Sequence, residues 1–305
     1  MEIYDLIIIG TGPAGLTAAI YAARREMKTL LIGKEIGGQV VWAREIENYP
    51  GFKIISNLEL IKRWQEQINF LKIPVINTEV NLIENQNDIF IVHAAQGTYH
   101  SRTIILATGV APRQLNIPGE KEFTGRGVSY CANCDGPFFK NKKVVVVGGG
   151  NAALDAAEVM TKIASQVVLV HRDDKFRAFE VLIKKVMTRA NLEIRYHTEV
   201  TAILGNGKVA AVRLRNNRTQ SSEELPAQGV FVEIGHEAKT GWLKDLVVLD
   251  EGGQIVIDKL GATSHQGIFA AGDVTASPYK QITVACGQGA TAALSAYQYL
   301  QLASA

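Results

Sequence analysis

Two of the three cysteines in this chain, Cys131 and Cys134, are separated by two residues in the segment "SYCANCDGPFF" and are followed at once by Asp135. A Cys-x-x-Cys pair can hold a metal ion, form a structural disulfide, or form a disulfide that is made and broken during catalysis. In the third case the neighbouring carboxylate can exchange a proton with a thiol. These eleven residues are compatible with all three roles, so the choice among them depends on the flanking sequence.

Length and composition narrow the class of protein. A chain of 305 residues predicts two domains, and 47% hydrophobic with 20% charged residues is typical of a soluble protein. The net charge of +2 favours neither a nucleic-acid partner nor an acidic tail. Three cysteines are too few for a secreted disulfide framework, and the start lacks a basic leader and a cleavage site. We expect a cytoplasmic protein without a membrane segment or an export signal.

A strand, a glycine turn and a helix follow one another twice along the chain. "YDLIIIG" runs into "GTGPAGLTAAIYAARR", and "KKVVVVGGGNAALDAAEVMTKIA" is followed by a further strand, "QVVLV". This repetition predicts an α/β fold with two Rossmann-like dinucleotide-binding domains. The outer segments "RTIILATG" and "GIFAAGDV" share one strand-then-turn form. We therefore predict a first domain from residues 1–115 and 245–305, with a second domain, residues 116–244, inserted into it.

The first glycine turn has the pattern Gly10-x-Gly12-x-x-Gly15. Glycine lets the turn form, lets backbone N–H groups approach a pyrophosphate, and lets the helix pack close to the strand. An acidic residue usually holds the ribose at the end of the second strand, but Gly33 stands there. Glu35 is a candidate for a displaced substitute.

The second turn, "GGGNAA" at residues 148–153, predicts the same cradle for a phosphate, and its second strand ends in "HRDDKFRA". Arginines at this place favour the 2′-phosphate of NADP through charge-assisted hydrogen bonds, so Arg172 and Arg177 indicate NADP. Asp173 and Asp174 favour NAD, because an acid repels a 2′-phosphate, unless their side chains face away. A solvated charged turn is the remaining alternative.

The order of motifs resembles that of the low-molecular-weight thioredoxin reductases over nearly the whole chain. The matching segments are "GTGPAGLTAAIYAAR", "GGQ", "IENYPG", "ATG", "CANCDG", "VVVVGGGNAALDAAE", "HRDDKFRA" and "GIFAAGDV" followed by "YKQ". The resemblance implies a homodimeric enzyme with FAD on the outer domain and NADPH on the inserted one. It further implies thioredoxin as the partner, and the Cys131–Cys134 pair as its redox-active disulfide.

The resemblance also implies roles for individual residues. Cys134 is expected nearer the flavin, Cys131 is expected to attack the partner disulfide, and Asp135 is expected to act as acid and base. We expect no metal, because no second Cys-x-x-Cys or spaced His pair completes a zinc site. The residues expected at FAD are Gly10, Gly12, Pro13, Ala14, Gly15, Gly38, Gln39, Asn48, Ala107, Thr108, Gly109, Gly272, Asp273 and Gln281. Those expected at the pyridine nucleotide are Gly148, Gly150, Asn151, Ala152, Ala153, His171, Arg172 and Arg177.

Because the disulfide and the nicotinamide site share the inserted domain, both must reach the same flavin from one side. We therefore predict a domain rotation about linkers near residues 112–119 and 240–247. Cys286 is expected to be a small packed residue. Several alternatives stay open: NADH, reduced ferredoxin or a deazaflavin as electron donor; a different protein disulfide as substrate; and a non-catalytic flavoprotein redox sensor.

Overall fold

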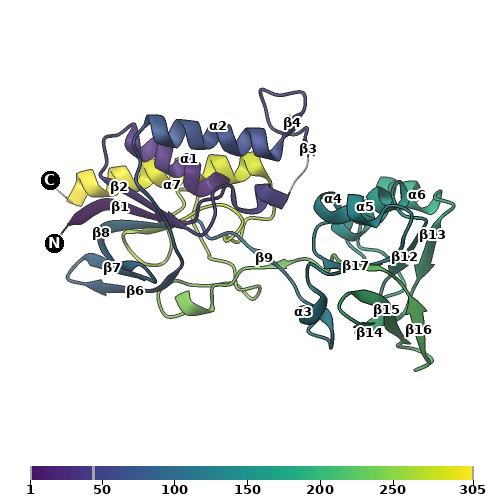
Figure 1. Ribbon diagram of the computed structural model, residues 1–305. Coiled ribbons are helices and arrows are strands. Elements are labelled where there is room, and N and C mark those ends of the chain that lie inside the picture. The colour runs from purple at the N-terminus through teal and green to yellow at the C-terminus, as the bar shows by residue number, and fades with distance from the viewer. Residues whose placement is uncertain (1, 43–44, 304–305) are drawn as a thin grey trace. The chain divides into compact units, whose positions relative to one another are not determined.

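The computed structural model describes residues 2–42 and 45–303. The chain forms two compact units, one made of Met1–Ala111 and Glu237–Ala305 and the other of Pro112–His236 (Figure 1). The second unit is thus inserted into the first. Each unit has its own sheet and its own buried clusters, and each is described separately below.

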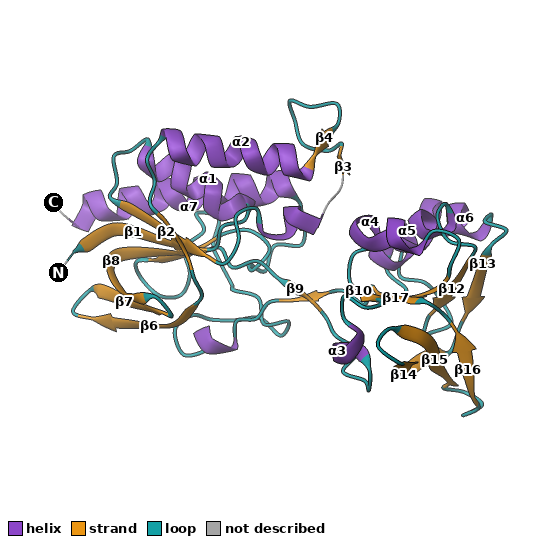
Figure 2. Ribbon diagram, viewed as in Figure 1, coloured by secondary structure: helices purple, strands orange, loops and turns teal. Residues whose placement is uncertain are grey.

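The first unit is built on a seven-stranded sheet in the order β5-β2-β1-β8-β7-β6, with β19 paired to β8 (Figure 2). Pairing is parallel from β5 to β8 and at β19, and antiparallel through β7 and β6. Its strands are β1 (Ile3–Ile9), β2 (Thr29–Gly33), β5 (Val75–Asn77), β6 (Val80–Gln86), β7 (Ile89–Ala94), β8 (Gly97–Leu106) and β19 (Ile268–Ala270).

The apolar run of β1 is explained by burial on both faces of this sheet. Leu6 and Ile8 belong to one buried cluster, whereas Ile7 and Ile9 belong to another. Successive side chains of a strand point to opposite faces, so a central parallel strand needs apolar residues at every position. Each fully buried aliphatic side chain of this kind stabilises the fold by about 1.5–3 kcal/mol.

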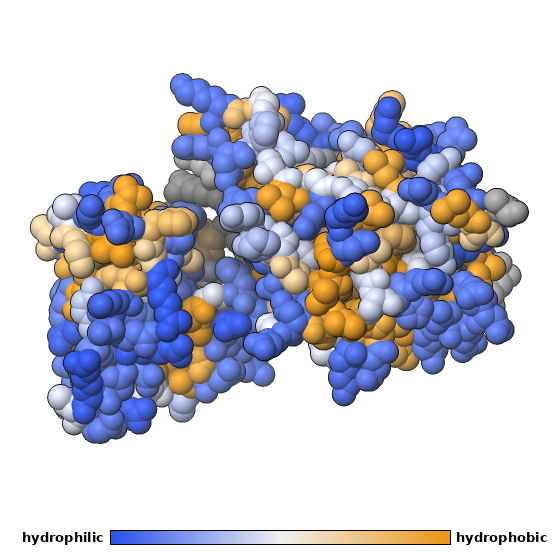
Figure 3. All heavy atoms as spheres, turned by 180° about the vertical axis from the view of Figure 1, so that it is seen from behind, coloured by the Kyte–Doolittle hydropathy of each residue, from blue (hydrophilic) through white to orange (hydrophobic). Residues whose placement is uncertain are grey.

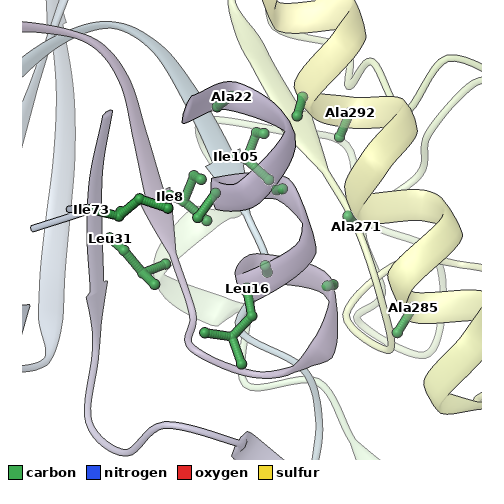
Figure 4. Close-up of a cluster of buried hydrophobic side chains, with 14 of the residues drawn as sticks. Ile8, Leu16, Ala22, Leu31, Ile73, Ile105, Ala271, Ala285 and Ala292 are labelled. Carbon is green, nitrogen blue, oxygen red and sulfur yellow. The ribbon is translucent and has the colours of Figure 1, made fainter. Parts of the chain in front are cut away.

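Three helices pack together in the first unit (Figure 2). They are α1 (Pro13–Ala23), α2 (Asn57–Phe70) and α7 (Ile282–Ala303). In Figure 4, Leu16 of α1 lies near the strands that carry Ile8 and Ile105, and Ala292 belongs to the same cluster on α7. A Cβ on Gly289 of α7 would come within 2.1 Å of the carbonyl oxygen of Ala14, so glycine permits α1 and α7 to touch at their backbones.

The second unit combines a parallel sheet of order β10-β17-β11-β12-β13 with an antiparallel sheet of order β14-β15-β16. Its strands are β10 (Val128–Ser129), β11 (Lys143–Val147), β12 (Gln166–Val170), β13 (Leu192–Arg195), β14 (Thr198–Gly205), β15 (Val209–Asn216), β16 (Ser222–Pro226) and β17 (Gly229–Val232). Its helices are α3 (Glu120–Phe123), α4 (Ala132–Asp135), η2 (Gly136–Phe139), α5 (Asn151–Thr161) and α6 (Glu180–Met187).

The predicted α/β fold class with two Rossmann-like units is confirmed, because β1 with α1 and β11 with α5 repeat one strand, turn and helix. The unit boundaries at 111 and 237 fall before the predicted 115 and 245. The short elements are η1 (Gly38–Trp42), β3 (Glu45–Ile46), β4 (Ile55–Ser56), β9 (Ala111–Pro112), β18 (His236–Glu237) and η3 (Gly241–Leu243).

The surface is mixed in polarity. In the space-filling view of Figure 3, hydrophilic residues cover much of each unit, and hydrophobic patches interrupt them. Among the described residues, no helix is long and apolar enough to cross a membrane. No group of three or more His, Cys, Asp or Glu side chains in residues 2–42 and 45–303 could hold a metal ion.

Candidate functional site

The first glycine turn connects β1 to α1 and is closed by backbone contact. Gly10 has a φ of +123°, and a Cβ there would lie 2.0 Å from the carbonyl oxygen of Ala107. A Cβ on Gly15 would lie 1.8 Å from the carbonyl oxygen of Gly10. Both positions therefore require glycine. Gly15 forms this tight packing and does not line the cavity in front of the turn.

The amino terminus of α1 faces this cavity with unpaired donors. Gly12 caps the helix without a side-chain hydrogen bond, and Pro13 opens it. The first N–H groups of a helix lack partners within the helix, and its dipole is positive at this end. The turn can therefore cradle a pyrophosphate, which is the observation that fits a dinucleotide here.

A cavity of about 780 Å³ opens in front of this turn, within the first unit. Its size falls in the range of small-molecule and cofactor sites. Segments far apart in sequence line it, including thirteen of the fourteen residues predicted for FAD. These are Gly10, Gly12, Pro13, Ala14, Gly38, Gln39, Asn48, Ala107, Thr108, Gly109, Gly272, Asp273 and Gln281.

Hydrogen bonds between distant segments join the polar groups of this cavity. Gln39 Nε2 donates to Asp273 Oδ2 at 3.2 Å, and Asn48 Nδ2 donates to Gln281 Oε1 at 3.1 Å. Lys280, which the sequence interpretation missed, also lines the cavity, and its Nζ donates to the carbonyl oxygen of Asp273 at 3.0 Å. Burial lowers the pKa of Lys280. Asp273 is thus held through its side chain by Gln39 and through its carbonyl oxygen by Lys280.

The missing acid at the end of β2 has a steric reason. A Cβ on Gly33 would lie 2.5 Å from Oγ1 of Thr11, and this hydroxyl donates to the carbonyl oxygen of Glu35 at 2.6 Å. Thr11 therefore occupies the space that a side chain at position 33 would need. Glu35 lines the cavity nearby, which keeps it a candidate for the ribose contact.

Cys131 and Cys134 form a disulfide in the second unit. Cys131 caps the short helix α4, and its Sγ accepts from the backbone N–H of Cys134 at 3.2 Å. Ser129, at the end of β10, accepts from the backbone N–H of Cys131 through Oγ at 3.0 Å. Both cysteines are half-buried. The sheet therefore holds the disulfide within reach of solvent, and Asp135 ends the same helix.

A buried carboxylate supports the segment that leads to this disulfide. Glu120 is 3% exposed and accepts hydrogen bonds from the backbone N–H groups of Leu115 and Asn116, at 2.8 and 2.6 Å. The hydroxyl of Tyr130 donates to the same carboxylate at 3.0 Å. Burial, followed by this hydrogen bond, raises the pKa of Tyr130 to about 12. The chain is thus fixed to the second unit from residue 115 onward.

Glu233, directly after β17, is a second residue that the sequence interpretation missed. Its carboxyl accepts a hydrogen bond from the backbone N–H of Ala132, which lies between the two cysteines. Burial raises the pKa of Glu233 to about 8, and the Asp155 carboxylate on α5 acts in the same direction. An acid at the end of the apolar strand "GVFVE" is the sequence signal that could have drawn attention to it.

The second glycine turn connects β11 to α5 and repeats the design of the first. Gly148 has a φ of +146°, and a Cβ there would lie 2.2 Å from the carbonyl oxygen of Glu233 and 2.7 Å from the Cβ of Ala153. Gly150 caps α5 without a side-chain hydrogen bond, and the first N–H groups of a helix lack partners within the helix. Asn151 Oδ1 accepts from the backbone N–H of Phe179 at 2.8 Å, and Ala152 follows it in the helix.

The "HRDDKFRA" loop is bonded directly to this turn. The backbone N–H of Arg177 donates to the carbonyl oxygen of Gly149 at 2.7 Å. The buried ring of His171 lies against Gly149, where a Cβ would come within 2.2 Å of Nδ1. His171 Nε2 also bonds to the carbonyl oxygen of Lys175 at 2.9 Å. His171 thus holds the loop in place through its contacts with Gly149 and Lys175.

A charged cavity of about 530 Å³ lies over this loop, within the second unit. Asp173 and Asp174 both line it, together with the cationic residues Arg172, Lys175, Arg177 and Arg218. The Asp173 carboxylate pairs with the Arg177 guanidinium at 3.1 Å. The cavity is lined by Arg172, Asp173, Asp174, Lys175, Phe176, Arg177, His197, Asn217 and Arg218.

Cys286 lies on α7 of the first unit, whereas the disulfide belongs to the second unit. It is half-buried, and its Sγ lies 3.9 Å from the carbonyl oxygen of Pro13. Burial raises the pKa of the Cys286 thiol. A thiol in this state is a weak nucleophile at neutral pH, in keeping with a packing role.

Two dinucleotide-type units, one of them carrying a Cys-x-x-Cys disulfide, define a class of two-domain disulfide oxidoreductases. The family described as pyridine nucleotide-disulphide oxidoreductase matches residues 4–289. The chain belongs to this family and is an oxidoreductase.

Individual relatives extend the match. The chain is 39% identical to thioredoxin reductase from Mycolicibacterium smegmatis, with 98% of this chain and 97% of the relative covered. It is also 39% identical to an alkyl hydroperoxide reductase of Pseudomonas putida, but there it spans only 59% of the relative's length. A crystal structure of thioredoxin reductase from Lactococcus lactis superposes with a TM-score of 0.89 at 38% identity, covering 98% of this chain and 99% of that one. The resemblance to low-molecular-weight thioredoxin reductases is therefore confirmed.

Proposed function

We propose that this chain is a thioredoxin-disulfide reductase that uses NADPH, FAD and the Cys131–Cys134 disulfide to reduce thioredoxin. The observation that carries the proposal is the closed disulfide on a unit that also has a glycine-turn nucleotide site. FAD, when bound, would supply the two-electron step between nicotinamide and disulfide. The cavity residues around Gly10, Gln39, Asp273 and Gln281 would hold it.

The cysteines carry the exchange with the partner. Reduction of the disulfide by two electrons and two protons gives two thiols. The Cys131 thiolate then attacks one sulfur of the partner disulfide, and the displaced partner thiolate takes up a proton. The Cys134 thiolate next attacks Cys131 Sγ, which releases the second partner thiol and restores the disulfide. Asp135, at the end of α4, would exchange the proton of Cys134.

A rotation between the two units would alternate the two half-reactions, because the nucleotide site and the disulfide share one unit. The connecting strands β9 and β18 pair with each other, and Glu120 fixes the chain from residue 115 onward. These contacts confine the first hinge to the few residues before Leu115. An engineered crosslink that locks one orientation should stop one half-reaction and leave the other intact. Survival of both in the locked protein would contradict the rotation.

We further propose a homodimer that works in the cytoplasm. The names of the relatives support thioredoxin or a thioredoxin-like protein as its partner. The match to the alkyl hydroperoxide reductase of Pseudomonas putida favours one alternative, in which a peroxidase-linked carrier accepts the electrons.

The proposal is tested by steady-state reduction of a thioredoxin disulfide with the flavin-loaded protein and NADPH. Wild type should turn over, and Cys134→Ser should not. A protein that oxidises NADPH but leaves thioredoxin disulfide intact, while reducing a peroxidase-linked carrier, would favour the alternative. Reduction of neither would contradict the proposed function.

A further inference from the structure

A hairpin turn brings a cation from another part of the chain to the charged cavity of the second unit. Residues 217–221 connect β15 to β16, and Arg218 from this turn lines the cavity together with Arg172, Lys175 and Arg177. Arg218 is 40 positions or more from the "HRDDKFRA" loop along the chain in the printed sequence. Only folding brings it there.

The turn that carries Arg218 is held by its own asparagine. Asn216 Oδ1 accepts from the backbone N–H groups of Arg218 and Thr219, each at 3.0 Å. The backbone N–H of Gln220 donates to the carbonyl oxygen of Asn216 at 2.9 Å. This Asx arrangement fixes the backbone of Arg218.

The turn is also bonded to the loop across the cavity. Asn217 Nδ2 donates to the carbonyl oxygen of Arg172 at 2.7 Å, and its backbone N–H donates to the carbonyl oxygen of His197 at 2.7 Å. The backbone N–H of His197 donates in turn to the carbonyl oxygen of Asp173 at 3.3 Å. The backbones that carry Arg172 and Arg218 are therefore tied together.

The balance of charge in the cavity favours an anion. Four cationic residues line it against the two carboxylates of Asp173 and Asp174. The Asp173 carboxylate pairs with Arg177, so each side chain offsets part of the charge of the other. In residues 2–42 and 45–303, no ion pair within 4.0 Å engages Arg172, Lys175 or Arg218. An unpaired arginine is suited to a phosphate because its planar fork of donors matches the oxygens.

We propose that Arg218 is a specificity-determining residue that binds the 2′-phosphate of NADPH. The inference rests on the proposed function, since it concerns the donor site of the same enzyme. Arg172 comes from the "HRDDKFRA" loop and Arg218 from the hairpin turn, and Asp173 pairs with Arg177.

Isothermal titration calorimetry on the flavin-loaded protein tests this with two probes, 2′,5′-ADP and 5′-AMP, at low salt. Wild type should bind 2′,5′-ADP more tightly than 5′-AMP. Arg218→Gln should weaken 2′,5′-ADP by about tenfold, the size of one charge-assisted hydrogen bond, and should leave 5′-AMP within about twofold. Arg218→Lys should recover part of the loss, because it keeps the charge without the fork.

Arg213→Gln is the matched control. Arg213 lies on β15 of the same sheet, is exposed, pairs with Glu224 at 2.9 Å, and does not line the cavity. It should leave both affinities unchanged. Equal losses in Arg213→Gln and Arg218→Gln, or no loss in Arg218→Gln, would overturn the inference. So would a wild type that binds both probes equally. Thioredoxin reduction with NADH would then show that the proposed reductase survives without this specificity.

Discussion

The two glycine turns share one backbone design but differ in their surroundings. Residues of the first turn line a cavity, whereas the cavity of the second unit is lined by the loop that bonds to the second turn. Around Gly10 the cavity is large, is lined mostly by small and apolar residues, and is joined by hydrogen bonds such as Gln39 to Asp273. The cavity over the "HRDDKFRA" loop is smaller, and six of its nine lining residues are charged. The first is suited to a cofactor that stays bound, and the second to a dinucleotide that enters and leaves.

What distinguishes the units is therefore the surroundings of the turn and not the turn itself. Main-chain donors and a helix dipole bind a phosphate in either unit. The Cys131–Cys134 disulfide belongs to the second unit alone.

The largest effect should come from removing the disulfide chemistry of the second unit. Cys134→Ser should lower the rate of thioredoxin reduction by at least about 1,000-fold, because no dithiol can re-form. The first unit should keep its flavin. The check is steady-state turnover together with the flavin absorbance per chain. Substantial turnover in the variant would contradict the role of the pair.

Gly10→Ala and Gly148→Ala form a matched pair that separates the two cavities. A Cβ at either position would meet a backbone oxygen, at 2.0 Å and 2.2 Å, and both residues have positive φ. Each substitution should cost about 1–3 kcal/mol of folding free energy. Gly10→Ala should lose most of its FAD, whereas Gly148→Ala should retain FAD and lose the pyridine nucleotide. Flavin content and calorimetric binding of NADPH are the measurements, and similar losses in both variants would contradict the assignment.

The pH dependence of stability should carry the signature of Glu233. Its pKa rises to about 8 in the folded protein, so folding favours the protonated carboxyl. Stability from this group is complete below its usual pKa of 4.5 and is lost as pH rises toward about 8. Glu233→Gln should remove this fall, which is on the order of 2 kcal/mol after allowance for solvent screening. Urea unfolding from pH 5 to pH 9 measures it, and parallel curves for both proteins would contradict the prediction.

The smallest effect should follow from freeing Arg177. Asp173→Asn removes the ion pair at 3.1 Å and one negative charge from the cavity. Because exposed ion pairs are worth about 0.2–1 kcal/mol, the KM for NADPH should fall by about two- to fivefold, with the KM for NADH unchanged. A rise in the KM for NADPH would mean that Asp173 positions Arg177 for the nucleotide.

Features that depend on local sequence patterns could be predicted, whereas features that depend on long-range contacts could not. The glycine turns, the buried strands and the insertion of one unit into the other depend on short sequence motifs and on their order. The contact between Glu233 and Ala132, and the place of Lys280 and Arg218 at their cavities, depend on tertiary folding. No spacing in the sequence encodes these encounters.

The acid expected at the ribose, where Gly33 stands, is another feature whose cause the sequence does not reveal. The sequence indicated that Gly33 lacks the expected carboxylate, but the reason is the hydroxyl of Thr11 in the same space. Asp173 is the converse case, because its acidic side chain was visible in the sequence while its pairing with Arg177 was not. Residue type is local information, whereas partner choice is set by the fold.

An anaerobic titration of the oxidised, flavin-loaded protein with NADPH, with flavin absorbance and free thiols followed together, shows whether electrons pass from the flavin to the disulfide. One chain that holds both a flavin and the Cys131–Cys134 disulfide should consume about two equivalents, since each centre accepts two electrons. Two new thiols should appear as the titration ends, and Cys134→Ser should consume about one equivalent. Full bleaching of wild type by one equivalent without new thiols, or no bleaching at all, would contradict the account.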